Sequence, residues 1–191
     1  MAQEDKIKWD KKYQNTPALL QHREPCKRLV QIIDKIEGTN ALEIACGTGR
    51  NSIYLAKKDF KVEALDISQV ALNTLNNLDY KNITTKLIDL DDYIPTSNSY
   101  DFIVMTNFLD RTLIPKLLKA LKKDGILFIE TYMDHKINEK PSSNPEFLLK
   151  AGELKTFCDE GFEILKYDEF LNDSYELYKM MKQSIVVKKT K

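Results

Sequence analysis

The stretch Ala41-Leu42-Glu43-Ile44-Ala45-Cys46-Gly47-Thr48-Gly49-Arg50-Asn51 joins an apolar run containing one acid to a pair of glycines. The apolar run is typical of a strand that is buried on both faces. The two glycines allow the main chain to turn tightly, and residues 51–56 have the composition of a helix start. The stretch therefore predicts a strand, a turn and a helix that bind a cofactor just beyond the end of the strand.

The charges around this turn indicate which cofactor it binds. A dinucleotide fingerprint has a third glycine three residues after the second, and Ser52 stands there instead. S-adenosylmethionine (SAM) has an ammonium and a sulfonium but no phosphate, so it suits an acid such as Glu43. A ribose needs a second carboxylate, which residues 61–66 supply because this predicted strand ends in Asp66. The spacing of the two acids suits one strand, helix and strand crossover.

Hydrophobic periodicity places further elements around this unit. It predicts two helices, at 4–14 and 28–36, ahead of alternating strands and helices, which is typical of a parallel sheet covered on both faces. Residues 162–171 and 175–188 flank a turn at 172–174 and predict an antiparallel hairpin at the sheet edge. The other strands are expected at 40–45, 61–66, 84–88, 100–106 and 125–131. The other helices are expected at 50–58, 68–78, 112–122 and 152–159, and a loop at 137–146 precedes the last of them.

Composition limits the class of protein. The 191 residues, 42% of them hydrophobic, suit one domain over 1–191, in which 1–38 form a helical lid or cap. Lys plus Arg equals Asp plus Glu at 29 each, so no nucleic-acid partner is expected. The scattered cysteines and the two distant histidines predict neither a disulfide framework nor a metal site. No apolar run approaches the ~20 residues of a membrane span. We expect a cytoplasmic protein, monomeric or homodimeric.

The pattern Glu-x-Ala-Cys-Gly-x-Gly, followed by a strand that ends in Asp66, resembles the class I SAM-dependent methyltransferases. Cys-Gly-Thr-Gly-Arg-Asn-Ser-x-Tyr-Leu-Ala at 46–56, and Gly-Glu-Leu at 152–154 before Gly161, resemble their tellurite-resistance branch. The resemblance covers most of the chain. It implies an α/β, Rossmann-like fold with a mostly parallel seven-stranded sheet and a C-terminal hairpin, and methyl transfer that converts SAM to S-adenosylhomocysteine. A generic parallel α/β domain is the plainer alternative.

Cofactor contacts are expected beyond the carboxyl ends of the strands. In similar enzymes an acid at the end of the third strand binds the adenine amino group, which implies Asp89 with Leu90 beside the ring; a solvated loop acid is the alternative. Arg50 suits either the methionine carboxylate or an exposed helix turn. The predicted cofactor set is Trp9, Tyr13, Glu43, Ala45, Cys46, Gly47, Thr48, Gly49, Arg50, Asn51, Asp66, Ile67, Asp89, Leu90 and Asn107.

The acceptor side has fewer signals. The residues after strand 100–106 contain neither the Asn/Asp-Pro-Pro-Tyr/Phe run of amino-group methyltransferases nor the Pro-Cys nucleophile of cytosine carbon methyltransferases. Arg111 suits an anionic substrate or an ion pair with Asp110 or Asp101, and the ion pair is preferred. Three residues near the end of the last parallel strand are placed to shape an acceptor pocket: Glu130, Tyr132 and His135. His135 is either a general base or a histidine of a surface loop.

These observations favour methyl transfer to a small molecule, such as a soft anion or a thiol. The alternatives are a methyltransferase for protein or RNA and a SAM-binding module without catalysis. The candidate catalytic or acceptor-pocket residues are Arg111, Tyr132 and His135. Whether residues 133–147 close over the acceptor is left open.

Overall fold

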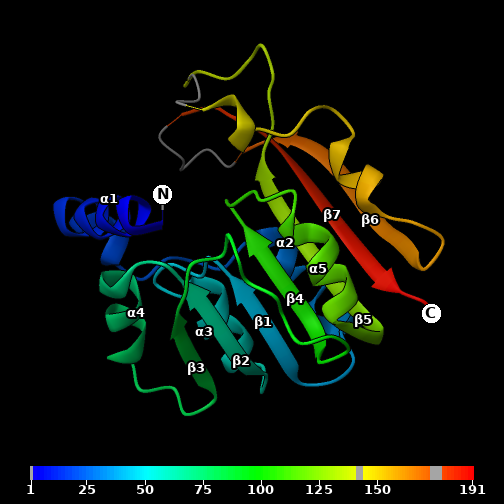
Figure 1. Ribbon diagram of the computed structural model, residues 1–191, viewed down its shortest axis with the longest axis horizontal. Helices are drawn as coiled ribbons and strands as arrows, with labels where there is room; N and C mark the ends of the chain where they lie inside the picture. The colour runs from blue at the N-terminus through cyan, green and yellow to red at the C-terminus, as the bar shows by residue number, and fades with distance from the viewer. Residues whose placement is uncertain (1, 141–143, 173–177) are drawn as a thin grey trace.

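The computed structural model describes residues 2–140, 144–172 and 178–191, and its centre is the apolar strand β1 (Asn40–Ile44). β1 lies in a seven-stranded sheet with the order β3-β2-β1-β4-β5-β7-β6 (Figure 1). Strand order reverses between β1 and β4, and ligands of open parallel sheets bind at such a point. The other strands are β2 (Lys61–Asp66), β3 (Ile83–Leu87), β4 (Tyr100–Thr106), β5 (Leu121–Tyr132), β6 (Phe162–Leu171) and β7 (Met181–Lys189).

The first five strands are parallel, and β7 is antiparallel to both β5 and β6. β7 therefore lies between β5 and the edge strand β6, so the C-terminal hairpin closes the sheet as predicted. Helices cover both faces, which confirms the Rossmann-like α/β fold.

Two apolar cores lie on the two faces of the sheet. One core packs α5 (Leu113–Ala120) and the 3-10 turn η4 (Glu153–Phe157) against the sheet. The other packs α2 (Lys27–Val30), the 3-10 turn η2 (Ile33–Lys35), α3 (Arg50–Ala56) and α4 (Gln69–Asn76). In Figure 1, α5 lies in front of the sheet, and α2 and α3 lie behind it. The sheet is thus held between two apolar layers, and polar chemistry is confined to the ends of the strands.

The N-terminal helix α1 (Ala2–Asn15) lies near the carboxyl ends of β2 and β3, above α4 (Figure 1). It is attached through Asp10, whose Oδ1 accepts hydrogen bonds from Ser68 Oγ at 2.6 Å and Val70 N at 3.1 Å. Ser68 is the N-cap of α4, so α1 is fixed to the start of that helix. The 3-10 turn η1 (Pro17–Leu20) follows α1.

Four expected element boundaries are wrong. The single helix expected at 28–36 consists of α2, a turn and η2. β5 begins at Leu121 rather than at 125, since Leu121 pairs with Tyr100 across a register shift. The helix expected at 152–159 is the shorter η4, preceded by another 3-10 turn, η3 (Pro145–Phe147), at the end of the loop expected at 137–146. The strand expected at 175–188 begins at Met181; residues 173–177, which include most of the expected turn, lie outside the described residues.

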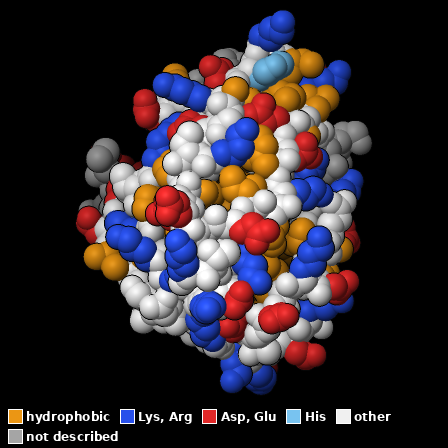
Figure 2. All heavy atoms as spheres, turned by 90° about the vertical axis from the view of Figure 1, so that its right-hand side faces the viewer, with side chains coloured by type: hydrophobic (Ala, Val, Ile, Leu, Met, Phe, Trp, Pro, Cys, Tyr) orange, Lys and Arg blue, Asp and Glu red, His pale blue; other side chains and the backbone are white. Residues whose placement is uncertain are grey.

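Figure 2 shows the side of the molecule where β6 forms the sheet edge. Basic and acidic side chains are interspersed there around a band of hydrophobic ones. β6 contributes Ile164, Leu165 and Leu171 to the exposed hydrophobic residues. In the described residues, no helix has both the length and the apolar character that crossing a membrane requires.

Candidate cofactor and acceptor site

The turn after β1 has a backbone that depends on its glycines. Gly47 and Gly49 have φ angles of +58° and +78°, in the left-handed region that favours glycine. A Cβ atom on Gly47 would lie 2.7 Å from the Tyr13 hydroxyl oxygen, so a side chain there would displace Tyr13. The turn is tied to the next strand because Cys46 N donates to the Leu65 carbonyl at 2.9 Å. The glycines thus make a bare turn against which Tyr13 packs.

Asp66, the last residue of β2, holds this turn in place. Its Oδ2 accepts from Gly47 N at 2.7 Å, and its Oδ1 accepts from Ser68 N at 2.8 Å. Burial raises the pKa of this carboxyl, and the backbone hydrogen bonds partly offset the rise. A carboxylate has about four acceptor positions, so Asp66 retains capacity for ribose hydroxyls.

Glu43 lies within β1 and is 1% exposed. Its carboxylate accepts hydrogen bonds from Asn51 Nδ2 at 2.9 Å and from Ser52 Oγ, both in the first turn of α3. Burial raises the pKa of Glu43 to about 7, although both hydrogen bonds favour the charged form. Asn51 is itself fully buried and accepts from Cys26 N at 2.9 Å. Asn51 therefore positions Glu43.

A cavity of about 430 Å³ lies between α1 and the ends of β2 and β3. It brings together the predicted residues Ile67 and Asp89. Leu90 instead is 5% exposed and packs in the core on the α5 side, and Ile88 lines the cavity in its place. The complete lining is Lys6, Ile7, Asp10, Ile67, Leu87, Ile88 and Asp89.

Residues of the N-terminal segment cover the turn. Tyr13 is 7% exposed, whereas Trp9 is 37% exposed and its ring lies tilted against that of Tyr13, with ring centroids 6.1 Å apart. Thr48 is buried, and its hydroxyl reaches the Leu19 carbonyl at 3.5 Å. Tyr13 therefore contacts the glycine turn, and Trp9 lies farther out on α1. Of the remaining predicted residues in this turn, Ala45 and Arg50 are half-buried and Cys46 is buried.

On the acceptor side, Arg111 has a different partner from the expected one. It donates to Glu153 from Nε at 2.6 Å and from Nη2 at 3.1 Å, and it also donates to the carbonyls of Glu146 and Leu148. The expected ion pair with Asp110 or Asp101 is wrong. Asp110 accepts from Thr112 N at the start of α5, and Asp101 binds Lys122 and the backbone N–H groups of Thr39 and Asn40 where β1 begins.

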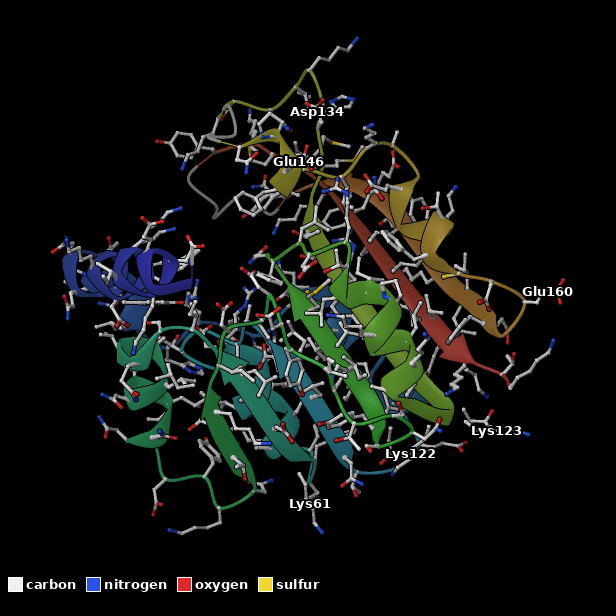
Figure 3. The ribbon with its side chains drawn as sticks, in the orientation of Figure 1. Lys61, Lys122, Lys123, Asp134, Glu146 and Glu160 are labelled. Carbon is white, nitrogen blue, oxygen red and sulfur yellow. The ribbon has the colours of Figure 1, made fainter. Side chains whose placement is uncertain are left out.

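Tyr132 is the last residue of β5, and His135 lies three residues beyond it. The ammonium of Lys182 lies 4.6 Å from the centre of the Tyr132 ring. His135 is half-buried, and its Nδ1 accepts from Ile137 N at 3.2 Å. Figure 3 shows Asp134 and Glu146 of this segment at one end of the molecule and Lys61, at the start of β2, at the other. The candidates from β5 and its following segment therefore lie at the strand ends where the cofactor turn also lies.

One polar cluster was not predicted as a unit. Cys26, Glu130 and Lys182 are 4%, 6% and 2% exposed, and Lys182 reaches Asn107 beyond the end of β4. Cys26 Sγ donates to Glu130 Oε2 at 3.1 Å, and burial raises the pKa of this thiol to about 12. From the sequence, Glu130 is expected in the acceptor pocket and Asn107 at the cofactor. Lys182, far along the chain in β7, was missed.

The residues around the turn fit SAM as a ligand. Two buried carboxylates suit its ammonium and its ribose hydroxyls, the glycine turn presents bare backbone beside Tyr13, and a cavity lies where the adenine is expected. Together with β7 inserted antiparallel between β5 and β6, this arrangement defines the class I SAM-dependent methyltransferase fold.

The chain belongs to the TehB family, because the family model described as "Tellurite resistance protein TehB" matches residues 1–188. It is 30% identical over 152 residues to the probable SAM-dependent methyltransferase TehB of Haemophilus influenzae, covering 74% of this chain and 52% of that protein. The chain thus spans about half the length of this curated relative. The crystal structure of TehB from the same organism superposes with a TM-score of 0.71 at 26% identity, covering 87% of this chain and 63% of that one.

A further curated relative is a ribosomal protein L11 methyltransferase of Campylobacter concisus. It is 31% identical over 113 residues, which are 56% of this chain and 41% of that protein. A solved structure titled for conversion of a disulfide bond into a thioacetal group in echinomycin biosynthesis has a TM-score of 0.72, covering 97% of this chain and 91% of its own. At 17% identity it shows the fold alone.

Proposed function

We propose that this protein transfers a methyl group from SAM to a small-molecule acceptor. The observation that carries the proposal is the convergence of Glu43, the turn at 45–51 and Asp66 at the reversal of strand order, with Tyr13 packed on the turn. Bound SAM supplies a methyl group already activated by a sulfonium, so the protein needs chiefly to position the two partners and exclude water.

Each side chain has a specific part in this proposal. Glu43 binds the ammonium of the cofactor as a carboxylate, and Asp66 accepts from the ribose while it fixes the turn. Ile67, Ile88 and Asp89 surround the adenine. The segment 1–38 acts as a lid that excludes water, with Tyr13 against the glycine turn and α1 attached through Asp10.

The acceptor that we favour is a soft nucleophile that is already ionised at neutral pH. Such an acceptor needs no protein base, and the residues after β4 lack the motifs that hold amines or attack cytosine. The family description names resistance to tellurite, a soft oxyanion, which supports this class. We propose that Tyr132 and His135 line the acceptor side. Since Arg111 binds Glu153 and two carbonyls, we assign it to holding the segment at 146–153 beside them.

Methyl transfer to protein is the second candidate, because a curated relative is named a ribosomal protein L11 methyltransferase. One experiment decides between the acceptors: purified protein is incubated with isotope-labelled SAM and a cell extract separated into small-molecule, protein and nucleic-acid fractions. We expect label in the small-molecule fraction or in volatile products. Label in protein or RNA would contradict the first choice, and SAM binding without transfer would indicate a module without catalysis.

We also propose that the protein works in the cytoplasm, as a monomer or homodimer. The free thiols of Cys26, Cys46 and Cys158 support a reducing compartment, in which thiols persist.

A further inference from the structure

A lysine and a glutamate are buried together on the acceptor side. Lys182 Nζ lies 3.6 Å from Glu130 Oε1, and their side chains are 3% and 8% exposed. Moving both charges out of water costs free energy on the order of the attraction they regain. A hydrophobic pair would pack between β5 and β7 without this cost. The pair therefore calls for a role other than stabilising the sheet.

The lysine also reaches the end of the neighbouring strand. Its Nζ donates to Asn107 Oδ1 at 3.0 Å. Asn107 follows directly after β4, is exposed, and has a φ of +55° in the left-handed region. Its backbone N–H donates to the Glu130 carbonyl at 2.8 Å. Both ends of Asn107 are thus held by the residues of one buried pair.

This contact decides which way the Asn107 amide faces. A lysine ammonium has only donors, so the amide must present its oxygen to Lys182. The Nδ2 group, with two N–H donors, then faces away from Lys182. Since Ile44 pairs with Met105 in the sheet, Asn107 lies just past the level at which the glycine turn leaves β1. The donors are therefore held next to the proposed place of methyl transfer.

We propose that Lys182 is a positioning residue, which with Glu130 fixes the Asn107 amide so that its Nδ2–H donors bind the methyl acceptor. This inference rests on the proposed function and adds the residues that read the acceptor. Two fixed donors favour an acceptor with lone pairs or negative charge, and they disfavour a protonated amine, which has no lone pair to offer. Asn107, which the sequence predicts at the cofactor, contacts the acceptor in this proposal, and Lys182 acts through Asn107.

The test measures binding at Asn107 directly. Protein labelled with ¹⁵N is titrated with sodium iodide, and separately with methylammonium chloride, while the side-chain amide signals of Asn107 are followed by NMR. In the wild type we expect a saturable shift with iodide and none with methylammonium. K182M keeps the aliphatic stem but removes the donors, so it abolishes the iodide shift, and K182R restores part of it.

A matched control lies at the other end of the same strand. Lys188 pairs with Asp124 at 2.9 Å, far from Asn107, so K188M removes a lysine charge from β7 and retains the iodide response. In steady-state assays with an anionic acceptor, K182M raises the acceptor KM about tenfold, because one charge-assisted contact is no longer oriented. The SAM Kd stays within about twofold of wild type, since the cofactor contacts are intact.

Several results would overturn the role of Lys182. These are an iodide shift at Asn107 that persists in K182M, no saturable shift in the wild type, or a loss of SAM affinity in K182M equal to the loss for the acceptor. If K182M does not fold because Glu130 is left buried and unpaired, the variant K182M/E130Q removes both charges and carries the same expectation. A wild type that binds iodide at Asn107 but transfers no methyl group would count against the proposed function and leave the positioning role standing.

Discussion

Replacing Glu43 with glutamine tests the central feature of the cofactor site. Burial raises the pKa of Glu43 from 4.5 to about 7 because the carboxylate loses water that its hydrogen bonds do not fully replace. Glutamine has nearly the same shape. Its Oε1 can accept from Asn51 Nδ2, and its Nε2 can donate to the hydroxyl oxygen of Ser52. E43Q therefore keeps the packing and removes the titration.

The raised pKa determines how stability varies with pH. The folded chain holds the Glu43 proton more tightly than the unfolded chain does, so the stabilisation is fully present below about pH 4.5 and is lost as pH rises through about 7. Between pH 5 and pH 8 the wild type should lose about 2 to 3 kcal/mol of unfolding free energy from this group alone. E43Q lacks this loss, so the free energy of unfolding of E43Q relative to the wild type increases by the same amount from pH 5 to pH 8.

Urea unfolding followed by circular dichroism at half-unit steps from pH 5 to pH 8 measures this difference. Other groups, including the carboxyl of Asp66, titrate equally in both proteins and cancel in the comparison. Two stability curves that run parallel over this range would refute the claim that Glu43 carries a buried, costly charge.

SAM affinity should rank the two proteins in the opposite order from stability. If Glu43 binds the SAM ammonium as a carboxylate, binding releases the Glu43 proton. The SAM Kd then decreases about tenfold for each unit by which the pH rises toward 7, and it is constant above pH 7. E43Q binds SAM more weakly and without this slope. Calorimetry in buffers of different ionisation enthalpy counts the released proton, and equal heats in all buffers at pH 6 would contradict the assignment.

Three further substitutions test other parts of the site. G47A forces a left-handed backbone on alanine and a clash with the Tyr13 hydroxyl, so we expect a loss of about 1 to 2 kcal/mol in urea unfolding and weaker SAM binding by calorimetry. The control G152A is also at positive φ but makes only an ordinary contact at 3.6 Å, so it should leave SAM affinity unchanged. R111M releases the segment at 146–153 and costs about 1 to 2 kcal/mol; limited proteolysis should become faster within that segment, and an unchanged cleavage pattern would argue against this role. D10A removes the contact between α1 and the start of α4, which should cost about 1 kcal/mol and change the fluorescence of Trp9, the sole tryptophan. An unchanged spectrum together with unchanged SAM affinity would contradict the proposal that α1 acts as a lid.

Local signals allowed most of the fold to be predicted from the sequence. The strand, turn and helix around Gly47 depend on neighbours in the chain, so residue order was enough to find them. The prediction of a single helix at 28–36 is wrong because the same apolar spacing buries one face equally well in a single helix or in a short helix followed by a 3-10 turn. The apolar residues concerned are Leu29, Ile32, Ile33 and Ile36. The early start of β5 depends on pairing with Tyr100, a contact between separate strands that apolar periodicity does not encode.

The same division holds for the site. Glu43 and Asp66 follow from their places on predicted strands, whereas their actual partners depend on the fold. Arg111 pairs with Glu153, 42 positions away, rather than with the acid beside it. Lys182 lies among several lysines near the end of the chain, and its sequence context is that of a solvated strand. Only the insertion of β7 beside β5 brings it to Glu130 and Asn107.

The buried cysteines matter for selectivity among nucleophiles. The chain carries soft sulfur atoms of its own, and Cys46 belongs to the glycine turn itself. Burial raises the pKa of Cys46 well above its usual range, and burial together with the charge of Glu130 raises that of Cys26 to about 12. Both groups therefore stay in the thiol form at neutral pH, and a thiol is a far weaker nucleophile than a thiolate. Burial in this fold thus keeps both sulfur atoms in their less reactive, protonated form.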